Sequence, residues 1–392
     1  MFPERFSNLP AYAFPRLRAL LDHHPAGGEP VHMTIGEPKH PFPAWVKDEL
    51  AANIDGFNNY PRNDGSEALL TAISGWIERR FSVKTDAASQ ILSLNGTREG
   101  LYNACMALVP EKKFGDTPNI LMPNPFYQVY AVGAASIGAN PVFVPATRST
   151  GYLPDFAGLP TDILKKTAAV FICSPSNPQG AVASREYLRD LINLGEVFDF
   201  QIFSDECYSE IYRDTPPPSA LEVAAEMNAH PERVVIFHSL SKRSNLPGLR
   251  SGFAAGGPKS LARLLQLRNF AGAPLPTPLQ AVAARAWSDE EHVIENRRLY
   301  QEKFAVADKV LADFEGYQGP EAGFFLWLPV EDGEEAALKL WTETGVRVLP
   351  GAYLSRDVNG NNPGKSYIRV ALVAPKQDVQ QGLEKLKNCI QN

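Results

Sequence analysis

One short segment of the chain combines a lysine, two hydroxyls and an arginine. Ser239, Ser241 and Lys242 follow an apolar run at residues 234–237, and Arg250 comes eight residues after the lysine. The run predicts a buried strand that delivers these side chains to one place. A lysine amine forms an imine with an aldehyde, whereas hydroxyls and a guanidinium suit a phosphate dianion. The segment therefore predicts a ligand that carries both groups, and pyridoxal 5'-phosphate is such a ligand.

Other polar side chains follow apolar runs of the same kind. Thr97 comes after residues 91–94 and opens a helix, so it either caps that helix or binds a phosphate together with the backbone N–H groups. Asp205 comes after residues 201–204, and its carboxylate either caps the next helix or holds a ring nitrogen protonated. Tyr208, three residues further on, is placed to reach the phenolic oxygen of such a ring.

Three further positions have one structural and one functional interpretation each. Asn177 lies in an Asn-Pro-x-Gly turn signal, or it directs its amide at the phenolic oxygen. Tyr127 belongs to the core or stacks on a flat ring. Arg369 lies between two aliphatic residues, so it faces solvent from a strand, or it is buried and needs a partner such as a substrate carboxylate. Most of these positions end predicted strands, where open α/β sheets bind ligands.

Short apolar runs alternate with helix-length segments over the first two thirds of the chain. This order predicts an α/β fold with a doubly wound, mostly parallel sheet. The last third favours a smaller α+β domain, in which helices pack on an antiparallel sheet. We expect residues 1–43 to pack with that small domain, residues 44–290 to form the large cofactor-binding domain and residues 291–392 to form the small one. The predicted strands of the large domain are 91–94, 119–122, 140–144, 168–173, 201–204 and 234–237.

Composition narrows the classes of function. The 392 residues are 44% hydrophobic and 21% charged, which is ordinary for a soluble enzyme, and the net charge of −6 argues against a nucleic-acid surface. Neither a secretory signal nor a membrane span is predicted. The four cysteines lack metal-ligand spacing, so we expect no metal site, and apolar surroundings favour free thiols in a reducing cytoplasm.

With these residues in this order, the chain resembles the fold-type I pyridoxal-phosphate enzymes of the class I/II aminotransferase family. The resemblance runs from Thr34-Ile35-Gly36-Glu37-Pro38 to Arg369, and its most specific part is Ser239-Leu240-Ser241-Lys242 with Arg250. Asn177-Pro178-x-Gly180 and Asp205-x-x-Tyr208 come in the order that the family has. One departure is Phe126-Tyr127-Gln128, which replaces a common Gly-Tyr-Pro at the position that stacks on the ring.

The resemblance implies a role for each matching residue. Lys242 would be the Schiff-base lysine and proton shuttle of a transamination between an amino acid and a 2-oxo acid, and Asp205 would pair with the pyridine nitrogen. Tyr60 would reach the phosphate of the partner subunit, which implies a homodimer with shared active sites. The other implied contacts are Tyr208 and Asn177 with the phenolic oxygen, Tyr127 with the ring face, Thr97, Arg98 (through its backbone), Ser239, Ser241 and Arg250 with the phosphate, and Gly36, Asn177 and Arg369 with the substrate.

Residues 241–253 are similar to N-succinyldiaminopimelate aminotransferases, which implies N-succinyl-diaminopimelate and 2-oxoglutarate as substrates in lysine biosynthesis. Alanine, aspartate and aromatic amino acids remain alternative donors, and a β-lyase or decarboxylase on the same fold keeps the same lysine. A ligand-sensing domain of a transcription regulator is disfavoured, because the N-terminal forty residues are too short and proline-rich for a DNA-binding module. A dinucleotide binder is also disfavoured, since the glycine cluster at 252–257 does not spell G-x-G-x-x-G.

Overall fold

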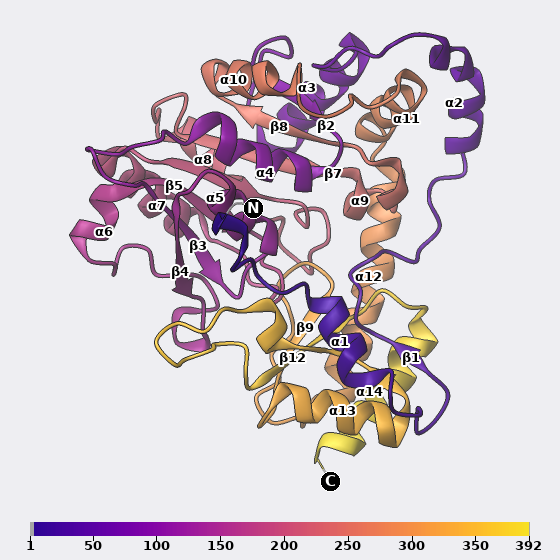
Figure 1. Cartoon of the computed structure of the whole chain (residues 1–392). Coiled ribbons are helices and arrows are strands. Elements are labelled where there is room, and N and C mark those ends of the chain that lie inside the picture. Colours follow the sequence, from indigo (N-terminus) through magenta and orange to yellow (C-terminus); the bar gives the residue numbers. More distant parts are fainter. Residues whose placement is uncertain (1–3, 392) are drawn as a thin grey trace.

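A seven-stranded sheet forms the centre of the larger region in this computed structural model, which describes residues 4–391 (Figure 1). The strand order is β2-β8-β7-β6-β5-β3-β4, and every neighbouring pair is parallel except the two pairs made by β8. The predicted doubly wound, mostly parallel sheet is therefore confirmed. The strands are β2 (Ile91–Leu94), β3 (Asn119–Asn124), β4 (Asn140–Pro145), β5 (Thr167–Cys173), β6 (Gln201–Asp205), β7 (Val234–Ser239) and β8 (Gly252–Gly256).

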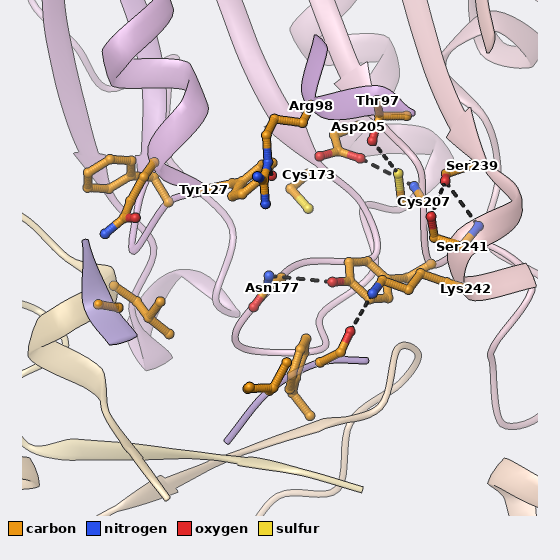
Figure 2. A pocket seen from close by; sticks show the side chains of 18 of the residues that line it. Thr97, Arg98, Tyr127, Cys173, Asn177, Asp205, Cys207, Ser239, Ser241 and Lys242 are labelled. Atoms are coloured by element: carbon orange, nitrogen blue, oxygen red, sulfur yellow. Dashed lines mark hydrogen bonds between the residues drawn. The ribbon is translucent and has the colours of Figure 1, made fainter. Parts of the chain in front are cut away.

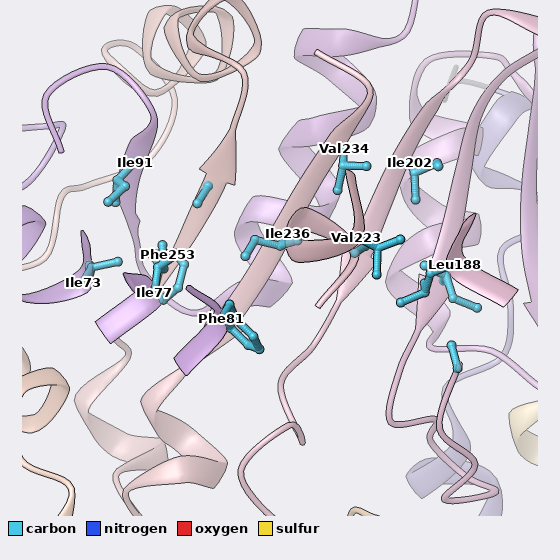
Figure 3. Packing of buried hydrophobic residues seen from close by; sticks show 14 of the residues in the cluster. Ile73, Ile77, Phe81, Ile91, Leu188, Ile202, Val223, Val234, Ile236 and Phe253 are labelled. Carbon is cyan, nitrogen blue, oxygen red and sulfur yellow. The ribbon is translucent and has the colours of Figure 1, made fainter. Parts of the chain in front are cut away.

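Helices cover both faces of this sheet. Because side chains alternate along a strand, Val234 and Ile236 of β7 pack with α3, α7, α8 and α11 on one face (Figure 3), whereas Val235 and Phe237 pack with α4, α5 and α10 on the other. Burial on both faces explains why the central strands read as continuous apolar runs. The helices of this region are α3 (Glu67–Phe81), α4 (Thr97–Leu108), α5 (Gln128–Ser136), α6 (Thr161–Lys166), α7 (Arg185–Phe198), α8 (Ala220–Glu226), α9 (Leu240–Arg243), α10 (Pro258–Arg268) and α11 (Thr277–Ser288).

The smaller region is built around a three-stranded antiparallel sheet in the order β11-β12-β9. Helix α12 runs down from the larger region into this one, and α13 and α14 pack beside the sheet (Figure 1). Its elements are β9 (Phe325–Pro329), β11 (Leu349–Pro350), β12 (Tyr367–Ala371), α12 (Glu291–Val310), α13 (Gly333–Thr344) and α14 (Lys376–Gln391).

The N-terminal segment joins the smaller region. Strand β1 (Val31–His32) pairs in parallel with β10 (Val346–Arg347), and α1 (Ala13–Leu21) packs against α13 through Leu17 and Trp341. The chain then crosses to the larger region through a strap at residues 34–43 and the helix α2 (Val46–Ala52). The division into domains at residues 43 and 290 stays a prediction. The described part of the chain also contains five short 3-10 helices: η1 (Glu4–Phe6), η2 (Ile54–Asn58), η3 (Arg148–Thr150), η4 (Pro247–Leu249) and η5 (Gly351–Leu354).

Local signals account for several helix boundaries. The hydroxyls of Ser66 and Ser184 accept hydrogen bonds from backbone N–H groups at the starts of α3 and α7, and the carboxylate of Asp332 does the same for α13. The left-handed residue Gly345 ends α13. Within residues 4–391, no helix combines the length and apolar character needed to cross a bilayer.

Candidate active site

A cavity of about 330 Å³ lies where β5, β6 and β7 end, and part of its wall comes from β9 and β12 of the smaller region (Figure 2). Its volume is in the range of small-molecule sites. The cavity brings together all the predicted site residues except Tyr60. These residues are Gly36, Thr97, Arg98, Tyr127, Asn177, Asp205, Tyr208, Ser239, Ser241, Lys242, Arg250 and Arg369.

Lys242 enters the cavity from α9, directly after the buried strand β7. Its amine donates a hydrogen bond to the carbonyl oxygen of Gly36 and lies 5.5 Å from the ring centre of Phe324. Burial disfavours the charged form and lowers the pKa of Lys242 to about 8. A neutral amine, which is the form that attacks an aldehyde or accepts a proton, is therefore present near neutral pH.

The start of α4 faces two hydroxyls and a guanidinium. Gly96 has a left-handed φ of 84° and gives the helix no side-chain cap, so its first N–H groups are free to bind an anion. Arg250 Nη2 donates to the carbonyl of Asn95 at 3.2 Å, and a Cβ on Gly96 would overlap that nitrogen. Ser239 Oγ lies 2.9 Å from Ser241 Oγ. Thr97 also lines the cavity, and the group fits a phosphate dianion.

Asp205 is a buried carboxylate at the end of β6. Its Oδ2 accepts a hydrogen bond of 2.8 Å from the Tyr130 hydroxyl, and its Oδ1 accepts one of 3.4 Å from the backbone N–H of Cys207. Burial raises the pKa of Asp205, whereas the hydrogen bonds from Cys207 and Tyr130 lower it. Within residues 4–391, no basic side chain pairs with this carboxylate. A protonated ring nitrogen would supply the missing cation.

Arg369 is only 5% exposed, so the interpretation as an exposed strand face is wrong. Its Nη1 donates to Asn177 Oδ1 at 3.0 Å and its Nη2 to the Thr34 carbonyl at 2.7 Å, while its Nε has no partner. Burial lowers the pKa of Arg369 to about 10. Asn177 also lies 3.5 Å from the Tyr208 hydroxyl through its Nδ2. A buried guanidinium without a carboxylate partner suits the α-carboxylate of a substrate.

Tyr127 lines the cavity, and its stacking on a bound ring stays a prediction. Its hydroxyl accepts a hydrogen bond of 2.8 Å from Arg98 Nε, and both residues line the cavity (Figure 2). Phe126 also touches the cavity but packs into the core against Phe143, with ring centres 4.9 Å apart. The resemblance implied a backbone role for Arg98, but the structure also turns its guanidinium towards the cavity.

Tyr60 lies outside the cavity and is fully exposed. Its expected contact with the phosphate needs a second subunit, so that role stays a prediction.

Several residues of the site were not identified from the sequence. Tyr130 follows Tyr127 by three residues, a spacing that places it one helical turn away and against Asp205. The thiols of Cys173 and Cys207 line the cavity, and the Cys207 sulfur lies 3.1 Å from the Thr97 hydroxyl. Their apolar sequence context indicated burial but gave no sign of the cavity.

The fold and this set of residues define a pyridoxal-phosphate enzyme of fold type I. Comparison with known proteins agrees, because a family model for aminotransferase class I and II matches residues 29–386. The chain belongs to that family. It is thus an aminotransferase that acts on amino acids and 2-oxo acids, with pyridoxal 5'-phosphate as its cofactor, as predicted.

Relatives cover almost the whole chain. An LL-diaminopimelate aminotransferase of Dehalococcoides mccartyi is 30% identical over 394 residues, which are 98% of each chain. One of Desulforudis audaxviator is 31% identical and covers 99% of this chain and 97% of its own. Among solved structures, an aminotransferase from Neisseria meningitidis has a TM-score of 0.94 at 37% identity, with 99% of this chain and 100% of that chain covered.

The residues present fit the cofactor. The free helix start with Arg250, the unpaired carboxylate of Asp205 and the buried amine of Lys242 match its phosphate, ring nitrogen and aldehyde in turn. When bound, pyridoxal 5'-phosphate accepts the electrons that a carbon–hydrogen bond releases. The protein supplies orientation, charge and a proton acceptor.

Proposed function

We propose that this aminotransferase takes its amino group from diaminopimelate, free or N-succinylated, and passes it to 2-oxoglutarate. The observation that carries the proposal is a guanidinium in the cavity in addition to those of Arg369 and Arg250. Arg369 is positioned to bind the α-carboxylate of a substrate, and Arg98 lies beside Tyr127, to which it donates a hydrogen bond. Two cations suit a substrate with two carboxylates, which diaminopimelate and 2-oxoglutarate both have. The curated relatives at 30–31% identity are named for diaminopimelate.

Each residue then has a defined task. Arg369 binds the α-carboxylate, and Arg98 pairs with the carboxylate at the far end of the substrate. The neutral amine of Lys242 removes the proton from Cα, and Asp205 holds a proton on the ring nitrogen as its counter-ion. Tyr208 and Asn177 bind the phenolic oxygen. Because Arg369, Asn177 and Tyr208 are linked by hydrogen bonds, the substrate carboxylate and the ring share one rigid support.

A half-reaction screen tests the substrate. Purified holoenzyme is mixed with LL-diaminopimelate, N-succinyl-LL-diaminopimelate, aspartate, glutamate, alanine and phenylalanine, and the loss of absorbance of the lysine-bound cofactor is followed. We expect the two diaminopimelate compounds to react with the highest kcat/KM. A higher kcat/KM with aspartate, alanine or phenylalanine than with both diaminopimelate compounds would refute the proposal.

A matched pair of variants tests the second cation. Arg98→Gln removes a charge-assisted bond worth about 1.5–3 kcal/mol, so kcat/KM for dicarboxylic donors should fall roughly 10- to 100-fold while that for alanine changes little. Arg189→Gln makes the same change at an exposed arginine of α7 that pairs with Glu226. Arg189→Gln should leave kcat/KM unchanged both for dicarboxylic donors and for alanine. An equal loss for alanine and the dicarboxylic donors in Arg98→Gln would remove Arg98 from this role.

Reduction with borohydride tests the lysine. The treatment should fix the mass of the cofactor on the peptide that contains Lys242, and Lys242→Ala should lose both that mass and transamination. Substantial transamination by Lys242→Ala would overturn the assignment.

We propose further that two copies of the chain form a homodimer in which Tyr60 completes the partner's phosphate site. Arg250 is exposed on one side of that site, and the segment before Tyr60 exposes the apolar side chains of Phe42, Ile54 and Phe57. Subunit mixing tests the arrangement. If Tyr60→Ala and Lys242→Ala are both nearly inactive, random hybrids should recover about a quarter of the wild-type activity, because one site in each hybrid is intact. No recovery would exclude shared sites.

A further inference from the structure

A buried asparagine outside the cavity holds the backbone of Lys242. Asn296 lies on α12 and is 3% exposed, and its Nδ2 donates to the carbonyls of Lys242 at 3.2 Å and Arg243 at 3.3 Å. These carbonyls end the single turn of α9, where no further helical N–H group follows to satisfy them. Asn296 therefore supplies the C-terminal cap that this short helix cannot make for itself.

The oxygen of the same side chain is also fully used. Asn296 Oδ1 accepts from Asn245 Nδ2 at 3.1 Å and lies 2.9 Å from His40 Nδ1. Because both Nδ2 protons point to carbonyls, the oxygen faces His40, and the histidine must carry its proton on Nδ1. All four hydrogen-bonding positions of the amide are occupied, which fixes its orientation.

His40 connects this cap to the amine of Lys242. His40 and Gly36 both belong to the strap at residues 34–43, and the Gly36 carbonyl accepts from Lys242 Nζ. The imidazole packs on the ring of Tyr300 at 4.6 Å, and Tyr300 stacks on Phe324 at 5.5 Å. Phe324 in turn faces Lys242 Nζ at 5.5 Å. A closed circuit of contacts therefore runs from the backbone of the lysine, through α12 and the strap, back to its amine.

We propose that Asn296 and His40 are positioning residues for Lys242. Asn296 fixes the turn from which the side chain starts, and His40 fixes the strap that receives its amine. Asn296 and Tyr300 are neighbours on one face of α12, so both parts of this circuit of contacts start from one helix. This inference rests on the proposed role of Lys242 as the proton acceptor.

Two variants and a control test the circuit. Asn296→Leu keeps the approximate volume but removes all four hydrogen bonds, and His40→Phe keeps the ring on Tyr300 but removes the Nδ1–H donor. Asn119→Leu is the control, because Asn119 is 4% exposed, donates to the Ile163 carbonyl at 3.1 Å and lies outside the cavity. All three variants lose hydrogen bonds of a side chain that is buried (Asn296 and Asn119) or partly buried (His40), so all three should lower Tm.

Two measurements separate an effect on the position of Lys242 from a general loss of stability. In Asn296→Leu, kcat per bound cofactor should fall about 10- to 100-fold while KM changes less than about threefold, since small misplacements of a reacting group cost rate. In the full-length chain stripped of cofactor, the pH midpoint for chemical labelling of Lys242 should rise above about 8 as the amine reaches water. His40→Phe should shift the midpoint in the same direction by a smaller amount, and Asn119→Leu should leave it unchanged.

If the pH midpoint for labelling of Lys242 is the same as in the wild type in both Asn296→Leu and His40→Phe, the proposal is overturned. If Asn296→Leu does not fold, the midpoint in His40→Phe decides alone. The labelling midpoint depends on where the amine of Lys242 lies and not on its chemical role. Activity of Lys242→Ala would refute only that role. Failure of the positioning proposal and failure of the proposed role of Lys242 are therefore distinguishable.

Discussion

Replacing Arg369 tests whether its buried guanidinium is a positive charge that becomes paired only when a substrate carboxylate binds. Burial lowers the pKa of Arg369 to about 10, which corresponds, at about 1.4 kcal/mol per pH unit, to a cost of about 3 kcal/mol for keeping the guanidinium charged. A substrate carboxylate that binds Arg369 can return that energy. We therefore expect Arg369→Met to lower kcat/KM by about two powers of ten.

The free energy of unfolding should change much less than kcat/KM in Arg369→Met. Arg369→Met removes the cost of burying the charge but also two hydrogen bonds from a charged donor, to Asn177 and Thr34, worth about 1.5 kcal/mol each at the lower end of the range for charged groups. These contributions nearly cancel, so the free energy of unfolding in urea should change by less than about 1 kcal/mol.

Arg233 provides the matched contrast. It is also buried, but it is paired with Glu196 at 3.1 Å and Asp199 at 3.4 Å, away from the cavity. Arg233→Met leaves the two carboxylates in water but removes a buried hydrogen bond of 2.6 Å to the Phe200 carbonyl, so it should lower the free energy of unfolding by about 1.5–3 kcal/mol and leave kcat/KM unchanged. The reasoning fails if Arg369→Met destabilises the protein as much as Arg233→Met does, or if it leaves kcat/KM near the wild-type value.

Three further predictions concern other groups of the cavity. Because burial lowers the pKa of Lys242, labelling of its amine in the cofactor-free chain should rise through a midpoint near pH 8, and a midpoint near 10.5 would contradict the buried position. Tyr130→Phe removes a hydrogen bond that lowers the pKa of Asp205, so the acidic limb of the pH–kcat/KM profile should move to higher pH; an unchanged limb would separate Tyr130 from this function. Gly96→Ala strains a left-handed position and displaces the Arg250 guanidinium, so equilibrium dialysis should show weaker binding of pyridoxal 5'-phosphate, whereas Gly138→Ala, also at positive φ but with open space, should keep it.

The sequence predicted the elements that carry strong local signals. Six of the seven strands of the large sheet begin within a residue of their predicted starts, because strands buried on both faces are continuous apolar runs. Strand β8 was missed, since Gly252–Gly256 contains one large side chain and looks like a glycine cluster. Its small residues are placed between β2 and β7, an arrangement that only the sheet pairing shows.

Side chains at strand ends were predictable for the same reason. Asp205 ends a buried strand, Lys242 and Asn177 come shortly after one, and the topology of the sheet brings those strand ends together. Tyr130 and Asn296 were not predicted, because each acts through a contact between distant segments. The distance along the chain is 75 residues for Tyr130 and Asp205, and 54 for Asn296 and Lys242. No local pattern encodes such contacts.

The same physical effect acts on three of the charged groups that line the cavity. Burial lowers the pKa of Lys242 and Arg369 and raises that of Asp205, so each group is driven towards its neutral form. Within residues 4–391, none of the three forms an ion pair. We propose that the cofactor offers a cation to Asp205 and an aldehyde to the amine of Lys242, and that the substrate offers a carboxylate to Arg369. Because binding relieves costs that folding imposed, loading with cofactor and then with a dicarboxylic inhibitor should raise Tm in two separate steps, and only the second should disappear in Arg369→Met.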